Sequence, residues 1–147
     1  MTRVDFYILN DTSPQARDLF ACRVVEKAYR LGHGVYLHTT NAQQAKRLDQ
    51  LLWTFKQNSF VPHAIEGDSP APNPPVLIGH ATHPGDTQPA QQRQVLVNLA
   101  AEVPLFFSSF ERVAEIIDQS KENKVSGRTR YRFYRDRGYR LENHQIG

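Results

Sequence analysis

The sequence predicts an α/β fold, a single three-layer domain over residues 1–147 with a largely parallel sheet. Short runs of β-branched, aromatic and aliphatic residues alternate with segments whose apolar residues recur at helical spacing. Strand and helix in alternation are typical of βαβ units and of a parallel sheet. The length suits one domain, and 39% apolar with 22% charged residues is ordinary for a globular protein. The outline is Rossmann-like.

The first half of the chain predicts two strand–helix pairs. Val4–Leu9 is a buried strand, followed by a helix from Pro14 to a stop at Gly32. Val35–Thr40 is a second strand, and Thr40 with Gln43 resembles a capping box that opens the next helix. The apolar face of this second helix consists of Ala45, Leu48, Leu51 and Leu52.

The second half predicts short strands between loops and ends in a basic helix. Phe55–His63 is a loop, and the segments 67–75 and 80–92 are loops rich in proline, glycine and polar residues. Val76–Gly79 and Gln94–Ala100 are strands. The remaining elements are a short helix at Pro104–Phe110, a last strand at Arg112–Asp118 and a helix within 121–138 that closes the fold.

Positive charge is concentrated at the C-terminal end of the sequence. Residues 121–147 contain eight basic and three acidic residues and carry +5, whereas residues 1–120 carry −2. A helix turns about 100° per residue, so one narrow face collects several of these cations and one aromatic ring. That cationic stripe comprises Lys121, Lys124, Arg128, Tyr131, Arg132 and Arg135.

Two interpretations of the cationic stripe stand open. It is either a solvated face that keeps the protein soluble or a surface for an anionic partner. Like-charged neighbours at i,i+4 repel, and Gly127 costs about 1 kcal/mol relative to alanine inside a helix. A helix that tolerates both penalties is held by packing or by a partner, which favours the second interpretation.

Residue patterns for catalysis and cofactors are missing from the sequence. The first strand–helix turn, LNDTSPQAR, has no glycine cradle for phosphates and contains Asp11, which would repel them. His80 and His83 lie three apart in a loop without an evident third ligand, so we expect no metal. Cys22 lies among apolar residues in mid-helix, which indicates a core position. We expect a protein that is not an enzyme and has no cofactor.

The compartment is predicted from the same composition. A single cysteine excludes an internal disulfide and fits a reducing environment. The N-terminal apolar run is too short for a signal peptide or a membrane span. We therefore expect a cytoplasmic protein without membrane contact.

Several motifs together resemble the chi subunit of bacterial DNA polymerase III holoenzyme. The resemblance covers nearly the whole chain, and its strength lies in the order and spacing of the motifs rather than in any one of them. It implies a Rossmann-like fold without nucleotide-binding loops, which agrees with the fold predicted from the residue patterns. The motifs are DFYIL near the start, RLDQLLW at 47–53, SFVPH at 59–63, the VLVNL strand and the C-terminal RYRFYRDRGY.

The resemblance implies a non-catalytic bridge between two proteins in DNA replication. Chi subunits bind the acidic, aromatic-ending C-terminal tail of single-stranded DNA-binding protein, and through the psi subunit they join the clamp loader. Such a protein is a monomer or a heterodimer with psi and meets DNA only indirectly. The tail site implied by position comprises Lys124, Arg128, Tyr131, Arg132, Ile117 and Arg135.

The psi site implied by position centres on Phe60, with Trp53 nearby. For Phe60 the alternative is ordinary core packing. For Trp53 a core position is expected, because a large ring at the end of an amphipathic helix usually closes the core. In the tail site Arg132 stands where chi subunits have a lysine, which keeps the charge but changes its geometry.

Direct binding of single-stranded nucleic acid is the competing function. In that interpretation the rings of Tyr131, Phe133 and Tyr134 stack on bases between arginines. The acidic body and the confinement of positive charge to one helix favour the tail site instead, because no long basic groove is predicted.

Overall fold

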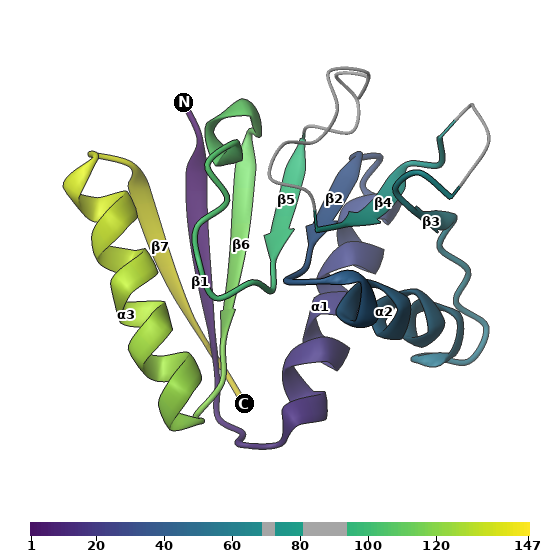
Figure 1. Ribbon diagram of the computed structural model, residues 1–147, viewed down its shortest axis with the longest axis horizontal. Coiled ribbons are helices and arrows are strands. Elements are labelled where there is room, and N and C mark those ends of the chain that lie inside the picture. Colours follow the sequence, from purple (N-terminus) through teal and green to yellow (C-terminus); the bar gives the residue numbers. More distant parts are fainter. Residues whose placement is uncertain (69–72, 81–93) are drawn as a thin grey trace.

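The computed structural model describes residues 1–68, 73–80 and 94–147 (Figure 1). Its elements in chain order are β1 (Arg3–Leu9), α1 (Pro14–Arg30), β2 (Val35–His38), α2 (Ala42–Thr54), β3 (His63–Ile65), β4 (Val76–Gly79), β5 (Val95–Asn98), the 3₁₀ turn η2 (Phe107–Ser109), β6 (Arg112–Ile117), α3 (Lys121–Asp136) and β7 (Arg140–Ile146). No described helix is long and apolar enough to cross a membrane.

The strands form one sheet in the order β3-β4-β2-β5-β6-β1-β7. Every strand pairing in the described part of the chain is parallel, so the prediction of a largely parallel sheet is confirmed. β1 lies between β6 and β7, whereas β3 and β7 form the two edges (Figure 1). The two edges of the sheet are therefore formed by different strands, the short β3 at one end of the molecule and β7 at the other.

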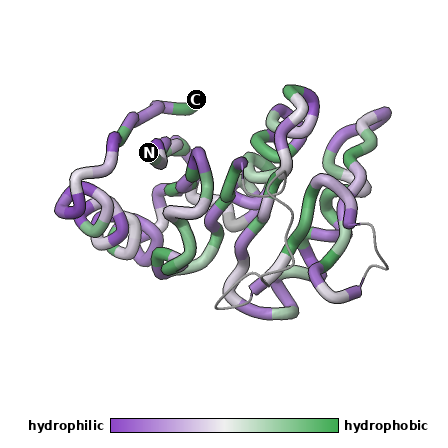
Figure 2. The backbone as a smooth tube through the Cα atoms, turned by 90° about the horizontal axis from the view of Figure 1, so that it is seen from above, coloured by the Kyte–Doolittle hydropathy of each residue, from purple (hydrophilic) through white to green (hydrophobic). Residues whose placement is uncertain are grey.

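Helices cover both faces of the sheet, which confirms the three-layer prediction. One apolar cluster joins α1 and α2 to the face that carries Leu37 and Val97. A second cluster joins α3 and η2 to the opposite face, which carries Phe6 and Val113. The apolar strands run through the middle of the molecule, and the largely hydrophilic α3 lies at its left end in Figure 2.

Two strands lie in segments where none is predicted. β7 pairs with β1 in parallel from Arg3↔Arg140 to Leu9↔Ile146, so the prediction that α3 closes the fold is wrong. β3 is only three residues long and begins at the end of the predicted Phe55–His63 loop. Both are edge strands, and a polar or very short edge strand lacks the apolar alternation that identifies a strand in a sequence.

Other predicted elements are present with small changes of extent. The helix predicted at Pro104–Phe110 is reduced to the single turn of η2. The predicted loop at 67–75 contains no helix or strand in its described residues, and most of the 80–92 loop lies outside the described part.

The cap of α2 is formed one residue later than predicted. Asn41, not Thr40, is the N-cap, and its side chain accepts a hydrogen bond from the backbone N–H of Gln44 at 2.9 Å. The Gln44 side chain in turn accepts from the backbone N–H of Thr40 at 2.7 Å. The reciprocal arrangement is a shifted version of the predicted box.

Candidate functional site

Local capping fixes both ends of α3. At the N-terminus, Ser120 accepts a hydrogen bond from the backbone N–H of Asn123 at 3.3 Å, and Asn123 accepts one from the backbone of Asp118 at 2.7 Å. At the C-terminus, Gly138 has a φ of +79°, and the N–H of Tyr139 bonds the carbonyl of Tyr134 at 3.1 Å. This pattern is a Schellman motif, which requires the left-handed conformation that glycine adopts freely. The helix thus has a defined register over the sheet.

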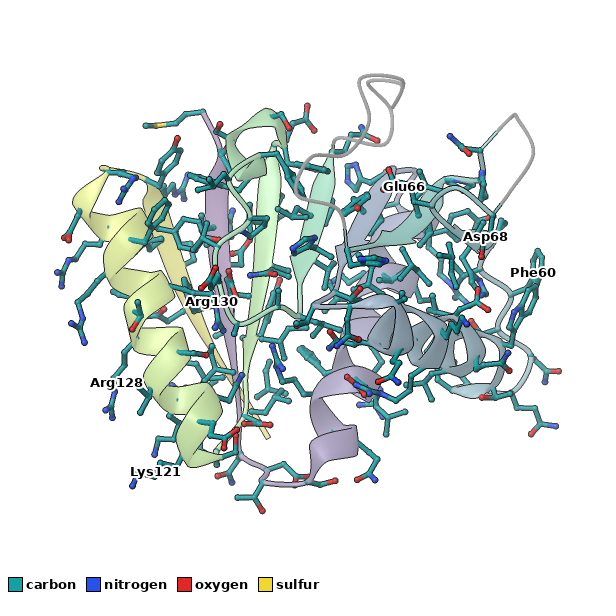
Figure 3. The ribbon with its side chains drawn as sticks, viewed as in Figure 1. Phe60, Glu66, Asp68, Lys121, Arg128 and Arg130 are labelled. Carbon is teal, nitrogen blue, oxygen red and sulfur yellow. The ribbon has the colours of Figure 1, made fainter. Side chains whose placement is uncertain are left out.

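The solvent face of α3 carries the predicted cations. Arg128, Arg132 and Arg135 are exposed, and Arg128 points away from the body of the molecule (Figure 3). Arg135 forms an exposed ion pair with Asp136 at 3.1 Å. In the described part of the chain the Arg128 side chain has neither an ion pair nor a hydrogen bond. Its guanidinium is therefore available to a ligand.

A pocket of about 210 Å³ lies between the N-terminal half of α3 and the sheet. It brings together four residues of the predicted tail site, Lys124, Arg128, Tyr131 and Ile117. Arg132 and Arg135 lie on the same helix but do not line it. The floor is apolar and the rim is cationic, which suits a ligand with an apolar end and a negative charge.

Besides Gly127, four residues that line this pocket were not predicted for it. Phe6 and Ile8 reach it from β1, Asn143 from β7 and Gln119 from the turn before α3. Val4, Phe6 and Ile8 alternate along β1 and so share the face that α3 covers. That alternation could have identified Phe6 and Ile8 from the sequence as residues beneath the helix. Asn143 could not be found without knowledge of β7.

Gly127 sets the distance between α3 and β6. A Cβ atom at this position would lie 2.5 Å from Cδ1 and 3.3 Å from Cγ1 of Ile117. Only glycine lets the helix approach the strand this closely, so the cost in helix propensity is explained by packing. Ile117 also forms part of the pocket floor. Helix packing and pocket shape are therefore coupled at one contact.

We expect Gly127→Ala to damage the pocket more than the fold. The new methyl group would push the flexible end of Ile117 toward the pocket, while alanine gains about 1 kcal/mol of helix propensity. The expected result is a several-fold loss of affinity for an acidic peptide with little change in the urea midpoint. Gly127→Ala combined with Ile117→Val, which shortens the displaced side chain, should recover part of the affinity. A midpoint that falls sharply while affinity is kept would contradict this coupling.

A buried ion pair anchors α3 on the sheet. Arg130 is 1% exposed and Glu115 on β6 is fully buried; Nε of Arg130 donates to Oε1 of Glu115 at 2.8 Å. Nη1 of Arg130 also donates to the carbonyl of Ala101 at 3.0 Å and to Oγ of Ser126 at 2.7 Å. Arg130 points from α3 toward the sheet, whereas Arg128 points outward (Figure 3). The basic helix therefore uses one arginine for structure and leaves others for a ligand.

The aromatic rings of α3 are mostly engaged in packing. Tyr134 is fully buried and donates to Oε2 of Glu115 at 2.8 Å; burial and then the Glu115 charge raise its pKa well above the ordinary value. Phe133 packs edge-on against Phe107, and Arg137 covers its ring at 3.5 Å. Base stacking on Tyr134, part of the nucleic-acid interpretation, is contradicted. Tyr131 keeps a half-buried ring at the pocket.

The opposite end of the molecule carries an exposed pair of aromatic rings, Trp53 and Phe60. Phe60 is 65% exposed, so the core-packing alternative for it is wrong. Trp53 is 52% exposed, so the expected core position is wrong as well. The rings lie 5.8 Å apart, and Trp53 also lies 4.5 Å from the ring of His63. Phe60 points outward at the end of the molecule opposite to α3 (Figure 3).

The loop that carries Phe60 is tied down on both sides of it. Ser59 donates a hydrogen bond to Glu26 on α1, and Lys56 pairs with the same carboxylate at 3.3 Å. On the other side, Val61 is 1% exposed. These contacts therefore hold the loop in the conformation that exposes Phe60.

In the described part of the chain, residue types suited to metal or nucleophilic chemistry lie away from the α3 pocket and do not converge. Within the described ranges, no group of three or more His, Cys, Asp or Glu residues could hold a metal ion, and His83 lies outside them. Burial raises the pKa of Cys22 to about 12, in line with its predicted core position. Burial, and then the charge of His80, lowers the pKa of His38 to about 4.

Comparisons with known proteins agree on one family. The sequence profile described as DNA polymerase III chi subunit, HolC, matches residues 1–142. A DNA polymerase III subunit chi from Pseudomonas aeruginosa is 41% identical over 147 residues, covering 99% of this chain and 98% of the relative. One from Escherichia coli K12 is 30% identical over 145 residues, covering 96% of each chain. Among solved structures, the crystal structure of T4 UvsW has a TM-score of 0.68 at 9% identity. It covers 99% of this chain and 41% of UvsW, a likeness of fold alone.

Proposed function

The chain belongs to the DNA polymerase III chi subunit family, and from that premise we propose that it is a non-catalytic accessory subunit that joins two proteins. One is the acidic C-terminal tail of single-stranded DNA-binding protein, bound at the α3 pocket. The other is a psi-like subunit of the clamp loader, bound at the aromatic pair of Trp53 and Phe60. The two surfaces lie at opposite ends of the sheet, so both partners can bind at once (Figure 3).

The main support for the tail site is the chemistry of the α3 pocket, the pocket between the N-terminal half of α3 and the sheet. Its volume of about 210 Å³ exceeds the roughly 150 Å³ cavity that accepts a benzene molecule, so a phenyl ring fits. Ile117 and Phe6 supply apolar contacts for the ring. Arg128 at the rim offers two parallel N–H groups to the carboxylate that follows a C-terminal phenylalanine.

Binding to two ligands, measured separately, tests the proposed function. We expect a DDDIPF-like peptide to bind the isolated protein and to shift the amide signals of α3 and of the pocket-lining residues in β1. A labelled single-stranded oligonucleotide should bind far more weakly, because Tyr131 is the one α3 ring that borders the pocket. If the oligonucleotide bound with comparable affinity and Arg128→Ala abolished that binding, the tail site would be overturned in favour of nucleic-acid binding.

Phe60→Ala should abolish binding of the psi-like partner and leave tail binding intact. The ring is mostly exposed and its loop is held by Ser59 and Val61, so its removal should leave the thermal midpoint unchanged within about 2 °C. Pull-down with the psi-like subunit and peptide titration check the two activities. Leu105→Ala is a matched control, since Leu105 is also exposed, at 71%, but lies on another surface. Loss of both activities in Phe60→Ala would contradict two separate sites.

A further inference from the structure

Part of one sheet face, the strip formed by β1 and β7, is left open beside α1. α1 contacts β2, β5 and β6, and α2 contacts β3 and β4. On the opposite face, α3 covers β6 and β7. In the described part of the chain the main helix contacts on this side do not extend to the β1–β7 pair, which α1 meets at its edge, where Phe20 packs against Tyr7. A three-layer fold has room there for one more helix.

A continuous groove follows this open strip along α1. Two hollows of about 360 Å³ and 420 Å³ share Phe20, Arg23 and Ile146, so they join end to end. They extend from Asp11 before α1 to His33 beyond its end. Since α1 has 17 residues, the groove is about 25 Å long, or roughly the length of a helix of the same size.

The floor of the groove is apolar and incompletely covered. Tyr7, Phe20, Val24 and Ile146 are half-buried and pack against the core beneath. Leu31 at one end is 65% exposed. An apolar strip of this length along one helix is the kind of surface that receives the apolar stripe of a second helix.

The charge of the groove is positive. Arg23 and Lys27, one helical turn apart, are exposed, and neither has an ion-pair partner within the described ranges. The groove also contains Asp5, whose side chain is only 2% exposed and is bonded by Arg3, Arg112 and His144, each at 2.9 Å. Burial acts to raise the pKa of Asp5, but these partners outweigh it and hold the pKa below its ordinary value. The Asp5 carboxylate is thus fully compensated. Asp11 at one end of the groove is exposed and has no ion-pair partner among the described residues, but Arg23 and Lys27 outnumber it, so the unpaired side-chain charges of the groove are net positive.

We propose that the groove between α1 and the β1–β7 face docks an acidic amphipathic helix of a partner protein. The occupant completes the layer beside α1, places its apolar stripe on Phe20, Val24 and Ile146, and directs its acidic flank toward Arg23 and Lys27. Complementary charge selects this occupant. This surface is distinct from both the α3 pocket and the aromatic pair, so the proposal does not depend on the proposed function.

Two other occupants fit the groove less well. A second copy of the chain docked face to face would place Arg23 and Lys27 of both copies together, which is repulsive. A nucleic acid would need exposed rings for its bases, but Tyr7 is stacked on His144 at 4.8 Å and packed edge-on against Phe20 at 5.3 Å. The apolar floor, whose rings are already packed against neighbouring rings, matches a peptide helix better.

The test uses an 18-residue synthetic peptide with leucines at helical spacing and flanking glutamates, added to the full-length ¹⁵N-labelled protein. We expect amide shifts at residues 20–31 and 144–146. The double variant R23E/K27E should weaken binding about tenfold or more. Lys46→Glu, an exposed charge reversal on α2, is the matched control and should bind as the parent does. Arg128→Ala should also bind normally at these residues, which separates the groove from the α3 pocket.

Each of the following outcomes would contradict the proposal and would indicate a different role for the groove. Equal binding of a peptide with glutamine in place of glutamate would overturn the charge argument. Shifts confined to α3 and lost in Arg128→Ala would show that the peptide uses the other site. A dimer in sedimentation that R23E/K27E abolishes, or oligonucleotide binding that maps to residues 20–31, would identify a different occupant. Thermal melts of R23E/K27E check that the two exposed substitutions leave the fold intact.

Discussion

Arg128→Ala should weaken the complex with an acidic C-terminal tail peptide by about tenfold to a hundredfold. Arg128 stands at the rim of the α3 pocket, and its side chain has no competing ion pair among the described residues. Hydrogen bonds to a charged group contribute about 1.5–3 kcal/mol, and about 1.4 kcal/mol corresponds to a factor of ten. Arg128→Lys should recover part of the affinity, since lysine keeps the charge but loses the planar fork. Calorimetry with the peptide measures each variant.

Arg132→Ala is the matched control for this prediction. Arg132 is exposed on the same helix, one turn further on, but does not line the pocket. Its removal should cost only a few-fold, and the loss should shrink at high salt because it acts through screened charge. Amidation of the peptide's C-terminus should weaken the parent strongly and Arg128→Ala little. Equal losses on amidation in both proteins would show that another group binds the carboxylate.

The layers of the fold follow from the sequence because its central elements have clean patterns. The core strands β2, β4 and β5 are buried along their whole length and appear as apolar runs. α2 has a regular apolar face through Ala45, Leu48 and Leu52. In such segments periodicity alone determines the type of element and the face that it buries.

Other features do not follow from periodicity, either because a general rule fails at one position or because they depend on contacts between distant residues. Trp53 follows Leu52 directly, so a turn of about 100° takes it off the buried face, and the rule that large rings close a core fails there. Arg130 resembles the other arginines of α3 until its partner on β6 is known. Glu115 gives one signal, because it lies between Val113 and Ile117 on the face that packs under α3. A carboxylate in that position needs a buried cation.

Glu115→Leu should give the largest loss of stability in the protein, about 3–5 kcal/mol. The substitution leaves the Arg130 guanidinium buried and uncompensated, and Nη2 of Arg130 already has no hydrogen-bond partner within the described residues. It also removes the acceptor of the Tyr134 hydroxyl and one acceptor of Asn98. Since small proteins have about 5–15 kcal/mol of stability in total, urea unfolding resolves such a loss easily.

The double variant Glu115→Leu with Arg130→Met distinguishes two quantities. One is the destabilisation caused by an unpaired buried charge, and the other is the net contribution of the ion pair to the free energy of unfolding. Replacing both buried ions by apolar side chains is often near neutral, so the double variant should regain more than half of the lost stability. Because the pair joins α3 to β6, Glu115→Leu should also loosen the pocket under α3 and lower peptide affinity, and the double variant should restore part of it. A double variant as unstable as Glu115→Leu alone would mean that the hydrogen bonds to Tyr134 and Asn98, rather than the ion pair, hold the helix on the sheet.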